Sequence, residues 1–356
     1  MNQSNNLTAL RWLAASMVLY GHSFVFLGLP EPVFMNWAPM GTVGVYIFFA
    51  ISGYLVTQSW ESDPDPVRFL QRRALRIFPG LIVCIALSVF VLGPLLTTLP
   101  LQTYFLNEHT WAYFTNVPLY ITYYLPGVFE TGKAPNAVNG SLWSLPAEFF
   151  MYLTLLVVGM LRIPKFGWVV VAGGLMLLSR LWASHATEML VMYRTDVRQV
   201  VICGVFFWVG AVFFKYRLSR LFSTTSVMCV VMIWLSLTRW PDWFVMAGWI
   251  MLPFLMLAFG LANGRLLSRL TAYDYSYGIY IYAFPIQQTV AKFWPTMPLP
   301  LYLLVTFSAT IAMAALSWHW IEKPALGLKP SRPFKEHGPL LSRILGKIRN
   351  RSEGAV

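Results

Sequence analysis

Charged residues are scarce in this sequence. Asp, Glu, Lys and Arg make up 11% of the 356 residues, against about 25% in a soluble domain. Hydrophobic residues make up 57%, and the mean hydropathy is +0.60. This composition excludes an ordinary soluble globular protein. Several apolar stretches approach or exceed the roughly 20 residues that cross a bilayer as a helix. The sequence therefore predicts an all-α, polytopic transmembrane helix bundle.

Cysteine is also rare, and its placement excludes two kinds of site. Cys84, Cys203 and Cys229 all fall in apolar segments, which indicates buried thiols rather than a disulfide framework. Neither the cysteines nor the histidines have the spacing of metal ligands. We therefore expect no metal site.

Acidic residues are outnumbered by basic ones, 14 to 26, which gives a net charge of +12. Such an excess can indicate nucleic-acid binding, but in a membrane protein it more often reflects the positive-inside rule. If the N-terminus lies inside, most of the basic residues fall in inside loops and the C-terminal tail. The pattern therefore predicts that both termini are cytoplasmic, and it explains the net charge without a nucleic-acid partner.

About ten spans are predicted, each with ends uncertain by several residues. They cover residues 7–29, 40–60, 77–99, 142–161, 166–184, 199–214, 222–240, 243–262, 272–293 and 299–321. We divide the chain into a transmembrane domain, residues 1–322, and a basic cytoplasmic tail, residues 323–356. The tail interleaves apolar and basic residues at a spacing compatible with an amphipathic helix on the inner membrane surface.

Two segments between the spans have distinctive compositions. Residues 61–76 form a strongly basic loop on the predicted cytoplasmic side. Residues 100–140 are rich in aromatic residues and nearly free of charge. Because aromatic rings settle at membrane interfaces, we expect the second segment to lie along the outer interface.

The most informative residue is His22, which follows Arg11 by eleven positions in the first span. An ionisable side chain inside the bilayer is costly, so its presence indicates function; the alternative is a histidine that hydrogen-bonds a neighbouring helix. Eleven residues of helix rise about 16 Å, which places His22 near mid-bilayer if Arg11 lies at one surface. A neutral imidazole there could abstract a proton from a hydroxyl or thiol, or briefly carry an acyl group.

Arg11, Arg73 and Arg76 are candidates for binding an anionic ligand from the cytoplasm. Arg73 and Arg76 cluster with Arg72 just before a predicted span. The alternative is that they are ordinary positive-inside residues in contact with lipid head groups. Guanidinium groups match phosphate geometry bidentately. Coenzyme A would fit, because its phosphates could stay at the basic mouth while its thin arm enters the bilayer.

Glu148 is a carboxylate that we place inside a span, near the outer end of the fourth. It has two interpretations. It could be an interfacial carboxylate that reaches water, or a functional group that fixes the tautomer of His22 or binds an acceptor hydroxyl. Small residues in the second span are interpreted as positions of close helix packing, and Ser52 has no motif that marks it as a nucleophile.

Short segments along nearly the whole chain resemble, in order, the motifs of the acyltransferase 3 family of integral membrane acyltransferases. Each motif is modest, but together and in order they are specific. One departure is Ala283, where many members carry a histidine. The matching segments are Arg11 to His22 (basic-x10-His), Phe48-Phe49 with Ser52-Gly53-Tyr54, Arg73-Ala74-Leu75-Arg76, Ser141 to Glu148, Tyr275 to Tyr280, and Ile321-Glu322-Lys323-Pro324.

The resemblance implies an O-acyltransferase in the bacterial inner membrane. Its donor would be cytosolic acyl-CoA, usually acetyl-CoA, and its acceptor a hydroxyl of an outward-facing carbohydrate such as O-antigen, exopolysaccharide or a lipid-linked precursor. By the same resemblance, His22 would be catalytic, Glu148 would support the site, and Arg11, Arg73 and Arg76 would bind the donor. Some members add an SGNH hydrolase-like domain; here acceptor-side work is expected from the bundle or a separate protein.

The residues by themselves leave two other classes open. A transporter or flippase for a lipid-linked or small polar substrate also needs a polar site at mid-bilayer. The absence of an internal repeat and of paired broken helices speaks against it. A membrane receptor or scaffold without chemistry is the third interpretation.

Overall fold

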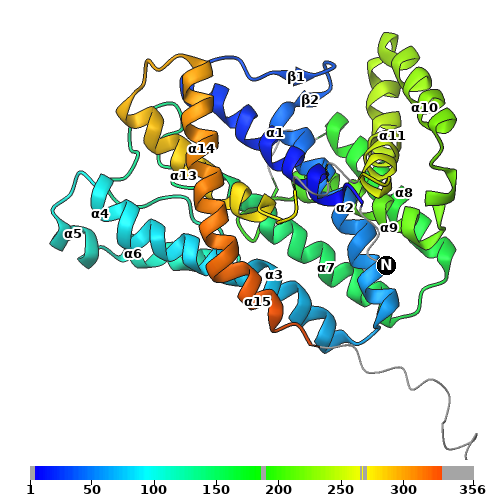
Figure 1. The fold of residues 1–356 in the computed structure, drawn as a ribbon, viewed down its shortest axis with the longest axis horizontal. Helices are drawn as coiled ribbons and strands as arrows, with labels where there is room; N and C mark the ends of the chain where they lie inside the picture. Colours follow the sequence, from blue (N-terminus) through cyan, green and yellow to red (C-terminus); the bar gives the residue numbers. More distant parts are fainter. Residues whose placement is uncertain (1–4, 186–189, 265–266, 268–270, 331–356) are drawn as a thin grey trace, which may run out of the picture.

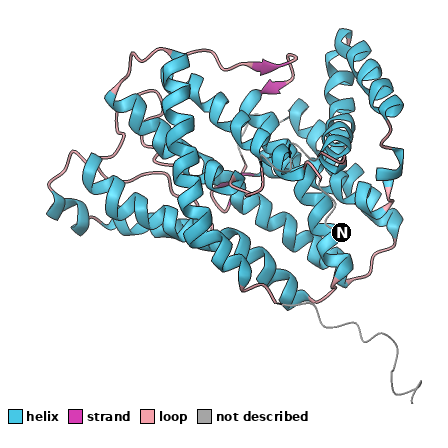
Figure 2. Ribbon diagram, in the orientation of Figure 1, coloured by secondary structure: helices cyan, strands magenta, loops and turns pink. Residues whose placement is uncertain are grey.

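The computed structural model describes residues 5–185, 190–264, 267 and 271–330, and this part of the chain is mainly helical (Figure 1, Figure 2). Within it, eight helical segments are long and apolar enough to cross a membrane. The all-α, multi-span bundle predicted from the sequence is therefore confirmed. The cytoplasmic placement of both termini stays a prediction, and residues 331–356 of the predicted tail lie outside the described residues.

Ten helical segments correspond to the ten predicted spans. Two of them, α10 and α13, are not among the eight that satisfy the span criteria. The ten are α1 (Leu7–Leu27), α2 (Met40–Ser62), α3 (Pro66–Leu87) continued by η1 (Ser88–Leu92) and α4 (Gly93–Leu96), η3 (Gly140–Trp143) with α7 (Ser144–Met160), α8 (Lys165–His185), α9 (Val197–Lys215), α10 (Thr224–Ser236) with η5 (Leu237–Arg239), α11 (Pro241–Leu261), α13 (Ser276–Phe293), and α14 (Leu299–Ser317) continued by η6 (Trp318–Glu322) and α15 (Lys323–Gly327).

Short elements connect these helices. They are the hairpin β1 (Val33–Phe34) with β2 (Ala38–Pro39), the hairpin β3 (Val191–Met192) with β4 (Thr195–Asp196), and the short helices α5 (Leu101–Leu106), α6 (Glu108–Ala112), η2 (Tyr113–Asn116) and η4 (Leu218–Leu221). Both hairpins are antiparallel, with Val33 opposite Pro39 and Val191 opposite Asp196.

The third span begins eleven residues earlier than predicted, so the predicted loop at residues 61–76 is largely helix. Asp65 caps α3 by accepting a hydrogen bond from the Arg68 amide at 2.8 Å, and Pro66 occupies the first helical position. An acidic cap followed by proline is a strong helix start. The run from Pro66 to Leu96 has 31 residues and a length of about 46 Å. Arg73 and Arg76 are therefore held on a rigid helix rather than on a loop.

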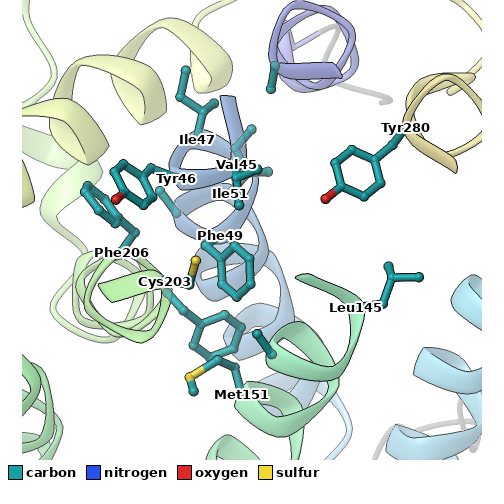
Figure 3. Packing of buried hydrophobic residues seen from close by; sticks show 14 of the residues in the cluster. Val45, Tyr46, Ile47, Phe49, Ile51, Leu145, Met151, Cys203, Phe206 and Tyr280 are labelled. Carbon is teal, nitrogen blue, oxygen red and sulfur yellow. The ribbon is translucent and has the colours of Figure 1, made fainter. Parts of the chain in front are cut away.

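The centre of the bundle is α2, which packs between α1 and α9. A Cβ atom at Gly53 would overlap the carbonyl oxygen of Phe207, and one at Gly210 would overlap that of Ala50. These glycines bring the two backbones into contact, as small residues do in membrane bundles. Beside them, Tyr46 stacks on Phe206 with ring centroids 4.2 Å apart (Figure 3). The packing role predicted for the small residues of the second span is confirmed.

Residues 97–139 fold into a cap on the bundle. Leu125, Val128 and Val138 are fully buried, and Gln288 of α13 donates to the carbonyl oxygens of Ala134 and Ala137 at 2.7 and 2.9 Å. The sequence predicted a segment lying along the outer interface. Several of its apolar side chains are buried, whereas Leu101, Leu106, Trp111 and Tyr120 are exposed. The position of this segment along the outer interface stays a prediction.

A proline in α13 ties that helix to the cap and to α3. Pro285 has no amide hydrogen, so the carbonyl of Ile281 loses its usual helical donor. Asn139 donates to this carbonyl at 2.7 Å, and the Cys84 thiol donates to it at 3.4 Å. On the α1 side, Gln287 donates to Leu19 and Ser23. These bonds fix the position of the α13 face that borders the site.

Candidate active site

A cavity of about 300 Å³ opens among α1, α2, α3, α7, α13 and the end of the chain that follows α14. Four of the five residues predicted for the site line it: Arg11, Arg73, Arg76 and Glu148. They come from three helices, so the tertiary fold brings them together. Further polar residues in the lining are Ser52, Ser144, Tyr152, Asp274, Ser276, Tyr277, Tyr280 and Lys329.

Asp274, which precedes α13, joins two of the predicted arginines. Arg11 and Arg76 donate to the same carboxylate oxygen, Oδ2, at 2.9 and 2.8 Å. The other oxygen accepts a hydrogen bond from Ser276 at 2.5 Å. Burial raises the pKa of Asp274, but the two guanidinium groups and the hydrogen bonds outweigh it and bring the pKa to about 2. Asp274 is therefore ionised at neutral pH and neutralises part of the arginine charge.

Glu322 is a second carboxylate that sequence reasoning gave no role. It is buried in η6, where its Oε1 accepts a hydrogen bond from Ser317 at 2.9 Å and its Oε2 lies 3.9 Å from the Arg76 guanidinium. Both η1 and η6 are π-helical insertions in longer helices, a feature often found near functional sites. Only the resemblance motif around residues 321–324 marked Glu322; nothing marked Asp274.

Arg72 lies outside the cavity lining. It donates to the Asp63 carboxylate at 2.5 Å, and Arg68 forms a bidentate pair with the same carboxylate at 2.7 and 3.0 Å. The hydrogen bond from Arg68 is the largest influence that holds the pKa of Asp63 well below its usual range. Arg72 and Arg68 therefore close the turn between α2 and α3.

Arg73 is the predicted arginine without an acidic partner among the described residues. Its guanidinium lies over the rings of Tyr152 and Phe69, 5.8 and 6.0 Å from the centroids. Its Nε is buried without a hydrogen-bond acceptor. The ring faces offset part of the charge, but the ionic partner that a buried cation usually requires is missing. The arginine is therefore prepared to receive an anion in the cavity.

Glu148 forms a cluster with Ser52 of α2 and Tyr152, one turn further along α7. Its Oε1 accepts from the Ser52 hydroxyl at 3.0 Å and from the Tyr152 hydroxyl at 2.5 Å, and the two hydroxyl oxygens are 3.2 Å apart. Among the described hydrogen bonds, none joins Glu148 to His22. The carboxylate faces the cavity and lies where it could receive a further hydroxyl. The partners Ser52 and Tyr152 were not expected; the four-residue spacing of Glu148 and Tyr152 was the available signal.

His22 does not line the cavity. Its ring lies edge-on to Phe284 of α13 and to Phe26, with centroids 5.3 and 6.3 Å apart, and its Nδ1 is buried without a hydrogen-bond partner. One turn before Phe284, Tyr280 lines the cavity, accepts or donates a 2.6 Å hydrogen bond with Ser144 and donates to the Ser141 carbonyl at 2.8 Å. Figure 3 shows the Tyr280 hydroxyl pointing toward the space between α2 and α7. One face of α13 therefore carries both Phe284, which contacts His22, and Tyr280, which lines the cavity.

The described residues offer no cluster of side chains that could bind a metal ion. Among the residues that the structure describes, no three His, Cys, Asp or Glu side chains gather as metal ligands would. The thiols of Cys84 and Cys203 are buried as predicted, whereas Cys229 is exposed, so the prediction was wrong for that residue.

Comparisons with known proteins agree with the motif pattern. A family model described as an acyltransferase domain matches residues 4–318. An O-acetyl transferase of Shigella phage Sf6 is 30% identical over 91% of this chain and 96% of its own length. Nodulation protein 10 of Rhizobium leguminosarum bv. viciae is 30% identical over 92% of this chain and 94% of its own length. The peptidoglycan O-acetyltransferase OatA of Listeria monocytogenes is 26% identical over 81% of this chain and 52% of its own length. No solved structure gives a significant match.

Proposed function

The chain belongs to the acyltransferase 3 family and is an acyltransferase, and we propose that it moves an acyl group, most commonly acetyl, from acyl-CoA to a carbohydrate hydroxyl. The observation that carries this proposal is the cavity itself. Its lining combines a cationic mouth, made by Arg11, Arg73, Arg76 and Lys329, where an anionic donor can bind, with the Glu148 cluster. A cavity with both features is suited to group transfer from a phosphate-bearing thioester.

The donor end of the proposal rests on charge. Arg11, Arg73, Arg76 and Lys329 line the cavity against the carboxylates Glu148 and Asp274, so cations are in excess. Guanidinium groups bind phosphates through paired hydrogen bonds. We place the phosphates of CoA at this end, on the cytoplasmic side, with the pantetheine arm directed along the cavity toward α7 and α13.

The chemical step is assigned to His22. An imidazole nitrogen would take the proton of the acceptor hydroxyl, whose oxygen forms a bond to the thioester carbonyl carbon as the carbon–sulfur bond breaks. The proton would pass to the sulfur, so the products are an ester and free CoA thiol. A transient acyl-imidazole is the alternative route. In either route the thioester would have to reach His22, which packs on Phe284 one turn from the cavity-lining Tyr280.

The acceptor is proposed to be an outward-facing carbohydrate, such as an O-antigen, an exopolysaccharide or a lipid-linked precursor. Two relatives support this choice by their names, an O-acetyl transferase and a peptidoglycan O-acetyltransferase. The proposed location is the bacterial inner membrane, with both termini in the cytoplasm, so that donor and acceptor arrive from opposite sides. Glu148 would bind or orient the acceptor hydroxyl, since its carboxylate already accepts two hydroxyl hydrogen bonds.

The test is acyl transfer by the purified protein in lipid, with acetyl-CoA and a lipid-linked polysaccharide precursor, following release of free thiol. Thiol release that requires both the precursor and His22 is the expected result. His22→Ala would be compared with His109→Ala, because His109 is exposed in the cap. Normal release by a folded His22→Ala protein would overturn the catalytic assignment. Passage of the precursor across the membrane without a covalent product would favour the flippase interpretation instead.

A further inference from the structure

The cations of the cavity fall into two groups. Arg11 and Arg76 share Asp274, and Arg76 also faces Glu322. For Arg73 and Lys329, no ion pair is found within the part of the chain that the structure describes. Asp274 and Glu322 offset the charge of the first group. Arg73 and Lys329 line the same cavity without a carboxylate at ion-pair distance among the described residues, although Glu148 acts on Arg73 from farther away.

Lys329 reaches this cavity because the last helix continues beyond its predicted end. The span predicted to end at residue 321 runs on through η6 and α15 to Gly327, and α15 packs against α3. Figure 1 shows α15 lying over α3. Leu326 and Lys329 then complete the rim of the cavity. A residue assigned by sequence to a separate tail therefore borders the site.

The surroundings of Lys329 favour a bound anion. Partial desolvation at the cavity mouth and the nearby charges of Arg73, Arg76 and Arg11 lower the pKa of Lys329 to about 8. Like charges that line one cavity repel each other, and an anion between them would reduce the repulsion. An ammonium group and a guanidinium group are the side chains that most often bind phosphate.

Resting on the proposed function, we propose that Arg73 and Lys329 together bind the phosphate groups of the acyl-CoA donor, while Asp274 holds Arg11 and Arg76 as the fixed wall of the cavity. The chemistry recognised is a phosphate ester. A phospholipid head group at the membrane surface would present the same chemistry, so the experiment must separate the two sources.

The experiment compares two thioester donors with Lys329→Gln protein in vesicles. Acetyl-CoA carries phosphates, whereas S-acetyl-N-acetylcysteamine carries none. We expect the KM for acetyl-CoA to rise about tenfold in Lys329→Gln with little change in kcat, as the loss of one charged hydrogen bond predicts. The KM for the phosphate-free donor should equal that of the wild type. The matched control is Lys323→Gln, an exposed lysine on α15 that does not line the cavity.

Three results would overturn the inference. An unchanged KM for acetyl-CoA in Lys329→Gln would remove the lysine from the donor site. An equal rise in KM for both donors would indicate a structural effect. A defect that disappears in vesicles without anionic lipid would assign Lys329 to a lipid head group. Failure of the proposed function is distinguishable, because the wild type would then release no thiol from either donor.

Discussion

Arg76 and Asp274 lie 198 positions apart in the sequence and form an ion pair of 2.8 Å at the mouth of the cavity. The same Asp274 oxygen also accepts from Arg11. One carboxylate thus ties the first and third helices to the start of α13. Because α13 also carries Tyr280 and Phe284, this pair connects the cationic mouth to the helix that borders His22.

Asp274→Asn should destabilise the protein and reduce its activity. Removing one partner of a fully buried ion pair typically costs about 3–5 kcal/mol. Because this pair is only partly buried, we expect a smaller loss. Thermal unfolding of the purified protein in detergent measures the first effect, and thiol release measures the second. Asp242→Asn is the matched control, since its pair with Arg180 is exposed and such pairs contribute roughly 0–1 kcal/mol. Equal unfolding temperatures for the two variants would contradict a structural role of Asp274.

Substitutions in the Glu148 cluster separate a carboxylate role from a serine nucleophile. Glu148→Gln keeps the size of the side chain but removes its charge, and we expect kcat to fall by about 10²-fold or more if the carboxylate orients the acceptor. Ser52→Ala removes one hydrogen bond to Glu148 and should reduce kcat by less than tenfold. The kcat values of both variants are measured as steady-state thiol release with saturating donor. Complete loss of turnover in folded Ser52→Ala would identify Ser52 as a nucleophile and displace His22 from that step.

Gly53→Ala should prevent normal packing of α2 against α9. The added methyl would overlap the Phe207 carbonyl oxygen, which is backbone and cannot rotate away, so we expect a loss of about 1–3 kcal/mol or more. Gly173→Ala is the control, because nothing lies within 4 Å of a Cβ at that position in α8. There the gain in helix propensity predicts unchanged or slightly higher stability. The measurement is the melting temperature of each variant compared with the wild type. A wild-type value for Gly53→Ala would contradict the prediction, because it would mean that α2 and α9 can move apart without loss of stability.

The efficiency of acetyl-CoA use should decline as the pH rises through about 8. The Lys329 pKa is lowered to about 8 in the free protein, so the ammonium form that binds phosphate is complete below that pH and lost above it. The charges that lower this pKa belong to Arg73, Arg76, Arg11 and Arg72, and guanidinium groups keep their charges across this range. Because kcat/KM reports the free enzyme, its profile should fall above pH 8 in the wild type. This decline of kcat/KM should be absent in Lys329→Gln. An equal decline in that variant would show that another group titrates.

The order of helices was available from the sequence because it depends on local properties. Apolar runs of sufficient length predicted ten spans, and the described structure has a helix at each of them. Arg11, Arg73, Arg76 and Glu148 could likewise be named in advance, because charged residues next to or inside apolar runs stand out. The predicted start of the third span, residue 77, followed the apolar run alone, whereas the cap at Asp65 and Pro66 starts α3 eleven residues earlier.

Only the tertiary structure decided how these residues are paired. Asp274 forms ion pairs with two of the arginines, and Glu148 accepts hydrogen bonds from Ser52 and Tyr152. Lys329, which follows the last predicted span, lines the cavity. Such partners come from helices far apart in the chain, and their choice depends on how glycine contacts such as those at Gly53 and Gly210 set the distances between helices. The hydrophobicity of one chain segment determines that it forms a membrane-spanning helix, whereas the packing between segments determines which charged residues form pairs.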